Sequence, residues 1–205
     1  TGVDLTPMEI PEPNLSYIFK HIITQEVAYQ TLLFKQRREL HEMVAEWYID
    51  IYNNTNNIEN QENTNEISIT LIPYLPLLAY HYRQTDNREK EFFYTKYAAK
   101  YAAEQFANVA AVDYLSRALE IILPHKYDER YELLCMREEV YRLQAKRKEQ
   151  KQDIVSINHL AKKIKDKEKQ VNAIYLMAKY ANTTHDYSSA IVEAKKIIVL
   201  GDIKD

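Results

Sequence analysis

Glycine is nearly absent from this chain of 205 residues, and its absence limits the folds that the chain can adopt. The two glycines, Gly2 and Gly201, lie close to the ends. Tight β-hairpins, β-bulges and phosphate-binding loops depend on glycine, because glycine adopts positive φ angles without a steric penalty. A β-rich fold and a nucleotide-binding loop are therefore excluded. We predict an all-α chain whose turns are made by Asn, Asp, Pro, Thr or Lys.

The overall composition is typical of a globular helical protein of the reducing cytoplasm. Hydrophobic residues make up 46% of the chain, and the net charge of -3 gives no general attraction to nucleic acid or anionic membrane. The most apolar stretch, residues 67–80, contains two prolines and is shorter than the roughly 20 residues of a membrane span. The single cysteine, Cys135, cannot form an internal disulfide. Because the chain begins at Thr1 without a leader sequence, we expect a cytoplasmic fragment of a larger protein.

Four regions follow from the pattern along the chain. Residues 1–34 begin with prolines, continue with the β-prone run Tyr17-Ile18-Phe19, where one short strand is expected, and end in a helix. Residues 53–66 are rich in asparagine and predict a flexible loop, and residues 67–205 predict a series of helical hairpins. Residues 35–52 predict the first helix of the stack, with one apolar face formed by Leu40, Met43, Val44, Trp47 and Ile51.

Two of the predicted hairpins resemble each other. Small residues occur at matching places in their paired helices, as in tetratricopeptide units of about 34 residues. The interval from Ala111 to Ala190 is longer than two such units, so a middle unit is expected to be longer or degenerate. We predict antiparallel hairpins stacked as a tetratricopeptide-like right-handed superhelix, with an ordinary helical bundle as the alternative. The repeated residues are Ala98, Ala99, Ala102, Ala111, Leu115 and Ala118 in one hairpin, and Met177, Ala178, Ala181, Ala190, Ala194 and Ile197 in the other.

A family resemblance comes from the first third of the chain. The segment from Tyr17 to Tyr29, with the following run from Leu32 to Ala45, resembles signal-transduction ATPases with numerous domains. More narrowly, it is similar to the region after the ATPase module in adenylate/guanylate cyclases of the soluble class. In those proteins a winged helix is followed by tetratricopeptide repeats, and the run Leu78-Ala79-Tyr80-His81-Tyr82 resembles the opening repeat helix. The resemblance implies that residues 1–34 are the end of a winged helix.

The resemblance also implies a nucleotide-sensing role for one residue. His21 occupies the place of a winged-helix histidine that reports on nucleotide bound by the neighbouring ATPase in that family. An imidazole can donate a hydrogen bond to a phosphate oxygen and changes charge near neutral pH. A structural hydrogen bond is the alternative role for His21. Because this chain has no phosphate-binding loop, ATP would bind to the parent protein, and no cofactor is expected here.

No arrangement of residues predicts a catalytic or metal site. His41 begins a sequence like a zinc-protease helix, but Ala45 stands where the second histidine is needed. The other histidines have no second ligand at helical spacing, and Cys135 lies in an apolar stretch typical of a buried, inert thiol. The chain is therefore not expected to be an enzyme by itself, although the parent class includes nucleotide cyclases and ATPases.

A basic run leaves two functional classes open. Between Arg142 and Lys169 there are ten basic and four acidic side chains, a local net charge of +6. Such a run is typical of a solvated helix face, or of a site for nucleic acid or an acidic partner, and it contains no aromatic residue for base stacking. We predict a regulatory region that binds a protein, a peptide, or the parent's own ATPase and cyclase domains. A DNA-binding regulator is the alternative, and the sequence leaves the oligomeric state open.

Overall fold

The structure is a computed structural model that describes residues 22–54 and 67–202. Within these ranges all of its regular structure is helical, which confirms the all-α prediction. The strand expected at Tyr17-Ile18-Phe19 and most of the asparagine-rich stretch lie outside the described residues. The helices are α1 (Ile22–Thr31), α2 (Phe34–Asn54), α3 (Leu75–Arg83), α4 (Arg88–Glu104), α5 (Asn108–Ile121), α6 (Tyr127–Leu143), α7 (Arg147–Ile164), α8 (Lys167–Thr183) and α9 (Tyr187–Asp202), with a short 3-10 helix, η1 (Ile72–Tyr74), before α3.

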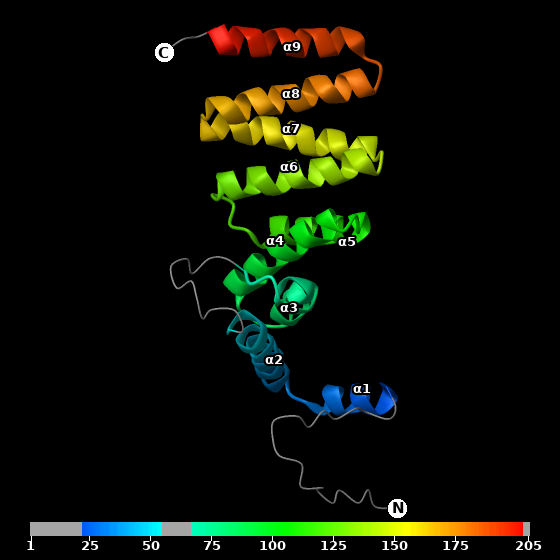
Figure 1. The fold of residues 1–205 in the computed structure, drawn as a ribbon, viewed down its shortest axis with the longest axis vertical. Helices are drawn as coiled ribbons and strands as arrows, with labels where there is room; N and C mark the ends of the chain where they lie inside the picture. Colours follow the sequence, from blue (N-terminus) through cyan, green and yellow to red (C-terminus); the bar gives the residue numbers. More distant parts are fainter. Residues whose placement is uncertain (1–21, 55–66, 203–205) are drawn as a thin grey trace, which may run out of the picture.

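The helices pack in the order of the sequence, so that from α2 onward each touches the helix before and after it. Figure 1 shows an elongated stack in which α1 and α2 lie at one end and α9 at the other. The pairs α4–α5, α6–α7 and α8–α9 are antiparallel hairpins. This arrangement confirms the prediction of stacked helical hairpins.

Side chains and prolines mark where several helices begin or end. The side chain of Asn87 accepts a hydrogen bond from the backbone N–H of Lys90 at 3.1 Å, which caps the start of α4. Asp166 caps α8 in the same way, through the N–H of Lys169 at 3.0 Å. A capping oxygen satisfies one of the free N–H groups of the first turn. Pro124 follows the end of α5, as expected for a residue that cannot continue a helix.

The turns inside the three hairpins share one unusual geometry. Phe106, Ala145 and His185 have φ angles of 57, 55 and 63°, in the left-handed region that favours glycine. In each turn the next backbone N–H bonds to the carbonyl five residues earlier, over 2.8 to 2.9 Å. At these three positions the prediction that Asn, Asp, Pro, Thr or Lys makes the turn was wrong. Between α7 and α8 it is confirmed, because Lys165 ends α7 with a φ of 61°. The closing hydrogen bonds and the packing of the hairpins hold these residues in a conformation that they rarely adopt.

The repeated turn gives the period of the stack. The turns recur at Phe106, Ala145 and His185, so the repeat is about 40 residues long, compared with about 34 residues for a tetratricopeptide unit. The two intervals between these turns are nearly equal. The interval between Ala111 and Ala190 therefore spans two repeats of nearly equal length. The extra length that was expected in one middle unit is shared by both repeats.

The middle hairpin has a polar pair where its neighbours have alanines. Positions equivalent to Ala99 and Ala111, which are fully buried in the first hairpin, are occupied by Glu138 and Gln150 in the second. Glu138 is 3% exposed and Gln150 is 2% exposed, and the Gln150 amide donates to the Glu138 carboxylate at 2.7 Å. A buried hydrogen bond thus replaces the contact between two small side chains. The third hairpin returns to alanine at the corresponding Ala178 and Ala190.

The apolar core is divided among the layers of the stack. Three clusters of buried residues lie between successive helices: α2 to α4, α4 to α6, and α6 to α8. Leu78, Leu115 and Ile157 are fully buried representatives of the three clusters. This one-dimensional arrangement is that of a repeat protein, in which each unit is stabilised by its neighbours.

Two buried carboxylates are held by arginines from the neighbouring helix. Arg117 on α5 donates from Nε and Nη2 to the fully buried Glu91 on α4, over 2.8 and 2.6 Å. Arg137 on α6 holds Asp153 on α7 over 2.8 and 2.7 Å. Because charge is costly to bury, these paired groups fix how the helices of each hairpin lie against each other.

The apolar face predicted for α2 is the exposed side of the helix, and not its core side. The helix buries His41 and Ala45 instead, which face α3. Periodicity shows that one side of a helix is apolar, but not which side the neighbours cover. The exposed residues are Leu40, Met43, Val44, Trp47 and Ile51, with 37 to 58% of each accessible.

None of the helices in the described ranges is long and apolar enough to cross a membrane.

Candidate functional site

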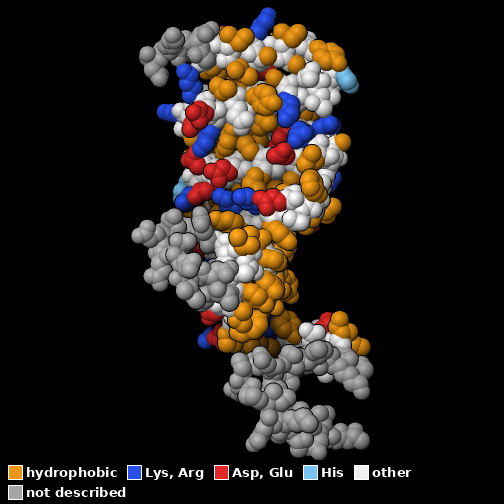
Figure 2. Space-filling view, viewed as in Figure 1, with side chains coloured by type: hydrophobic (Ala, Val, Ile, Leu, Met, Phe, Trp, Pro, Cys, Tyr) orange, Lys and Arg blue, Asp and Glu red, His pale blue; other side chains and the backbone are white. Residues whose placement is uncertain are grey.

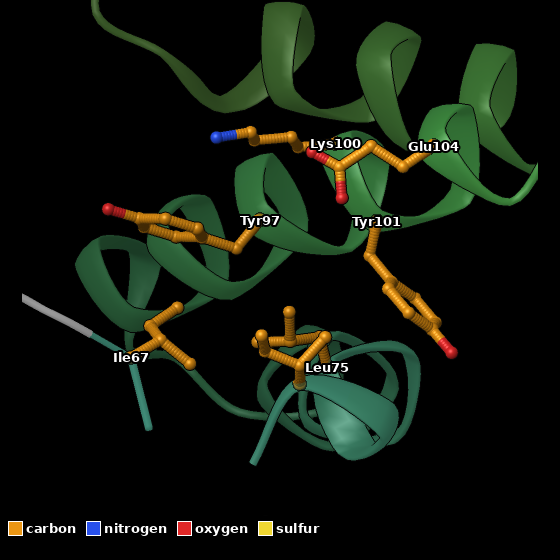
Figure 3. A pocket seen from close by; sticks show the side chains of 7 residues that line it. Ile67, Leu75, Tyr97, Lys100, Tyr101 and Glu104 are labelled. Carbon is orange, nitrogen blue, oxygen red and sulfur yellow. The ribbon is translucent and has the colours of Figure 1, made fainter. Parts of the chain in front are cut away.

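A pocket of about 360 Å³ opens between α4 and the segment that leads into α3. We call it the tyrosine pocket, because Tyr97 and Tyr101 form its sides (Figure 3). Positions 97, 100, 101 and 104 recur at helical spacing and so lie on one face of α4. The complete lining is Ile67, Ile72, Leu75, Tyr97, Lys100, Tyr101 and Glu104.

The pocket has a firm base because both of its walls are fixed by the core. Leu75 is only 2% exposed and packs in the first core cluster with Ala98, from the inner side of α4. Ala99 and Ala102, on the same inner side, pack in the second cluster against α5. With this side of α4 buried, Tyr97 and Tyr101 remain at the surface beside Leu75.

The pocket combines an apolar base with free charges. Figure 3 shows Ile67 and Leu75 on one side and Lys100 and Glu104 above them on α4, with the two tyrosine hydroxyls pointing outward. Neither Lys100 nor Glu104 has an ion-pair or hydrogen-bond partner in the described part of the chain. An arrangement of this kind can hold an apolar side chain while the charged groups bind polar groups beside it.

More aromatic side chains extend the surface around the pocket. Phe93 contacts Tyr97 with ring centres 4.7 Å apart. On the side of α2, Tyr52 stacks on Tyr74 at 4.2 Å, and Tyr48 packs on Tyr74 at 5.2 Å. Tyrosine is enriched at protein interfaces because one side chain offers both apolar area and a hydrogen-bonding hydroxyl.

A second pocket, of about 610 Å³, lies where α4, α5 and α6 meet. Its base is apolar and aromatic, but its three basic side chains are already paired. Arg88 and Arg117 bind Glu91, and Lys126 binds Glu129. Among the described residues Glu89 is the one unpaired charge of this pocket. We consider the smaller tyrosine pocket the better candidate site, because an unpaired base and an unpaired acid lie together there.

Comparison with known proteins gives no relative. No known protein family, curated protein or solved structure matches this chain. The resemblance to cyclase-type signal-transduction ATPases therefore stays a prediction. His21, to which it assigns a nucleotide-sensing role, lies outside the described residues.

The structure brings together two histidines that lie far apart in the sequence. Nδ1 of His41 on α2 lies 2.8 Å from Nδ1 of His81 on α3, and the Tyr29 hydroxyl lies 3.0 Å from Nε2 of His41. In the described part of the chain, no group of three or more histidine, cysteine, aspartate or glutamate side chains could hold a metal ion. The pair is a hydrogen-bonded link between α1, α2 and α3. Its two rings come from different helices, so no local spacing in the sequence gave a signal for it.

This histidine pair predicts a loss of stability in mild acid. Burial lowers the pKa of His41, and burial and the nearby His41 lower the pKa of His81, from an ordinary value of 6.5. Above pH 6.5 both rings are neutral in the folded and unfolded chain, so the link is complete. Below it the unfolded chain takes up protons that the folded pair excludes, so the free energy of unfolding falls. We expect urea unfolding to show this decline between pH 7 and about 5.

Carboxylates also change the free energy of unfolding in acid, so a matched control is needed to isolate the contribution of the histidine pair. A His81→Asn variant should lose part of the decline, whereas the exposed His125→Asn variant should keep the slope of the original chain. Equal slopes for all three proteins would contradict the role of the pair.

The thiol of Cys135 is predicted to react slowly with disulfide reagents. Burial raises its pKa to about 11, so little thiolate exists at neutral pH. We expect the native chain to react with a disulfide reagent at pH 8 at least about tenfold more slowly than the urea-unfolded chain, as followed by absorbance. Equally fast labelling of both states would show that Cys135 is accessible and ionised.

The basic run does not form one patch. Lys146, Arg147 and Lys148 lie at the first turn of α7, and Lys162 and Lys163 lie at its last turn. A helix of 18 residues is about 27 Å long, so the two groups stand at opposite edges of the stack. The basic run alone therefore gives no continuous basic surface for DNA. The winged-helix-like segment, the other basis of the DNA-binding alternative, begins outside the described residues, so that alternative stays a prediction.

Proposed function

We propose that this chain is a protein-interaction region that binds a peptide segment of a partner in the tyrosine pocket. The observation that carries the proposal is the pair of charges, Lys100 and Glu104, which have no ion-pair partner among the described residues and lie above an apolar base between two tyrosines. An apolar side chain of the partner occupies the base, an acidic group binds Lys100, and a basic group binds Glu104. An apolar base flanked by two tyrosines is typical of a surface that recognises another protein.

The proposal extends to the protein from which the chain comes. The recurring turns support a superhelix of tetratricopeptide type, although with longer units of about 40 residues. The resemblance of residues 17–45 supports a cytoplasmic multidomain signalling ATPase of cyclase type as the parent. In that setting the partner segment belongs to another protein or to the parent's own ATPase or cyclase domain, and binding regulates the parent.

A peptide selection tests the proposed site. Random peptides are selected on the immobilised chain, and the best one is titrated by fluorescence anisotropy. We expect a peptide with an apolar residue beside an acidic one, and at least about tenfold weaker binding to a Lys100→Glu variant. The control variant Lys148→Glu changes the same charge at an exposed site on α7 and should bind as the original chain does.

Exchanging the charges of the peptide and of position 100 tests whether the two groups contact each other. A peptide in which the acidic residue is replaced by lysine should bind Lys100→Glu better than it binds the original chain. The proposal fails if no peptide is selected, or if selected peptides bind both Lys100→Glu and Glu104→Lys as tightly as the original chain.

A further inference from the structure

One end of the stack carries an exposed apolar face on α2. We call it the α2 face, and it consists of Leu40, Met43, Val44 and Trp47. Asp50 is exposed next to these residues, one turn beyond Trp47. Figure 2 shows hydrophobic side chains gathered at this lower part of the stack. Contiguous exposed apolar surface of this kind is unusual in a chain that acts alone.

The opposite end of the stack has a similar apolar face on α9. The α9 face consists of Ile191, Val192, Ile198 and Val199, each between 54 and 64% exposed. Lys195 lies between the two apolar pairs, because positions 191, 195 and 198 recur at helical spacing. Figure 2 shows this apolar end at the top, with Lys or Arg side chains projecting from it.

Among the described residues, no polar helix covers the α2 face or the α9 face. In repeat proteins each unit covers the apolar side of the one before it, and the terminal units are normally polar outside. Inside this stack Leu119 on α5 packs in the core with α6. Ile198, the equivalent position two hairpins later, is 63% exposed.

The charges beside the two apolar faces indicate whether each face packs on its own copy or on the other face. Neither Asp50 nor Lys195 has an ion-pair partner among the residues that the structure describes. Two α9 faces packed antiparallel about their centre would place Lys195 opposite its own copy, because it lies midway between Ile191 and Val199. Two α2 faces packed antiparallel would bring their exposed Asp50 side chains toward the same contact without a base to pair with, because Glu39 on that side already pairs with Lys35 at 3.7 Å. An α9 face on an α2 face joins opposite charges.

We propose that copies of this chain associate end to end, with the α9 face of one copy packed on the α2 face of the next. The inference goes beyond the proposed peptide site and uses a different surface. Such a contact joins two different faces, so each added copy leaves one free face of each kind. The assembly therefore grows with concentration and has no fixed size unless it closes into a ring.

The single tryptophan reports directly on this contact. Trp47 is the one tryptophan in the chain and lies on the α2 face, where it is 54% exposed. As the concentration rises to about 1 mM, light scattering should show a rising mass, and the Trp47 emission should shift to shorter wavelength. A chain that stays monomeric with unchanged emission over this range overturns the proposal.

Two variants show whether the faces pair as proposed. Met43→Glu blocks the α2 face and Ile198→Asp blocks the α9 face, both at exposed positions where circular dichroism can confirm folding. Each variant alone should be monomeric. Their equimolar mixture should form a dimer and nothing larger, because one intact face of each kind remains. Association of either variant alone, or a mixture that stays monomeric, overturns the end-to-end contact.

The same samples separate this inference from the proposed function. Peptide binding in the tyrosine pocket should be unchanged in Met43→Glu and Ile198→Asp. Lys100→Glu should associate as the original chain does. A monomeric chain that still binds the selected peptide would overturn self-association alone, and an associating chain without peptide binding would overturn the proposed function alone.

Discussion

Replacing Arg117 with alanine is expected to lower the free energy of unfolding by about 3–5 kcal/mol. Glu91 is fully buried, and Arg117 supplies two of its hydrogen bonds from the facing helix. Without Arg117 the one partner of the carboxylate among the described residues is Arg88, whose side chain is 65% exposed. A buried charge that loses its main partner is left with an uncompensated cost of desolvation. Urea unfolding followed by circular dichroism at neutral pH measures the loss.

Arg142→Ala is the matched control for this prediction. Arg142 pairs with Glu139 within α6, and the carboxylate is 64% exposed, so its loss should cost less than about 1 kcal/mol. The double variant Glu91→Gln, Arg117→Ala should recover part of the stability, because the uncompensated charge is gone. A loss in Arg117→Ala as small as that of Arg142→Ala would show that the buried pair does not hold α4 against α5.

The second large effect is expected for Gln150→Ala in the middle hairpin. The Glu138 carboxylate is 3% exposed, and Gln150 is its one hydrogen-bond partner among the described residues. Because the substitution leaves a buried acceptor without its donor, the variant should lose about 1–3 kcal/mol of stability. Thermal and urea unfolding of the variant measure this change.

The neighbouring hairpins supply the comparison for Gln150→Ala. The double variant Glu138→Ala, Gln150→Ala recreates the alanine pair of the first and third hairpins, so it should be more stable than Gln150→Ala alone. If the double variant is less stable than Gln150→Ala alone, an alanine pair does not pack in the middle hairpin as it does in the first and third.

The helical class of the chain and its first long helix, predicted over residues 35–52 and found at Phe34–Asn54, were predictable because their signals are local. Apolar spacing, prolines and residues such as Asn87 and Asp166 define helix starts and ends within a few positions. The hairpin turns at Phe106, Ala145 and His185 have no such signal, since nothing in their chemistry favours positive φ. Their conformation follows from the packing of the two helices that they join.

The repeat was only partly visible for a related reason. Alanine pairs marked the first and third hairpins, but the middle hairpin carries Glu138 and Gln150 at the same positions. A polar pair is not a sequence mark of a close helix contact. Glu138 and Gln150 can be matched to the alanine pairs of the other hairpins only when the recurring turn is known.

The candidate site was not predictable from periodicity. The spacing of Tyr97, Tyr101 and Glu104 places them on one face of a helix, but Ile67 and Leu75 oppose them across a separate segment of the chain. The α2 face illustrates the same limit, because an apolar stripe was predicted correctly and its exposure was not. Both depend on which elements lie side by side.

Amide hydrogen exchange with and without the selected peptide tests the central claim, that the tyrosine pocket binds a partner segment. We expect bound peptide to slow exchange in residues 97–104 and 67–75, and to leave α7 and α9 unchanged. Protection confined to other helices, or none in α4 at saturating peptide, would contradict the claim.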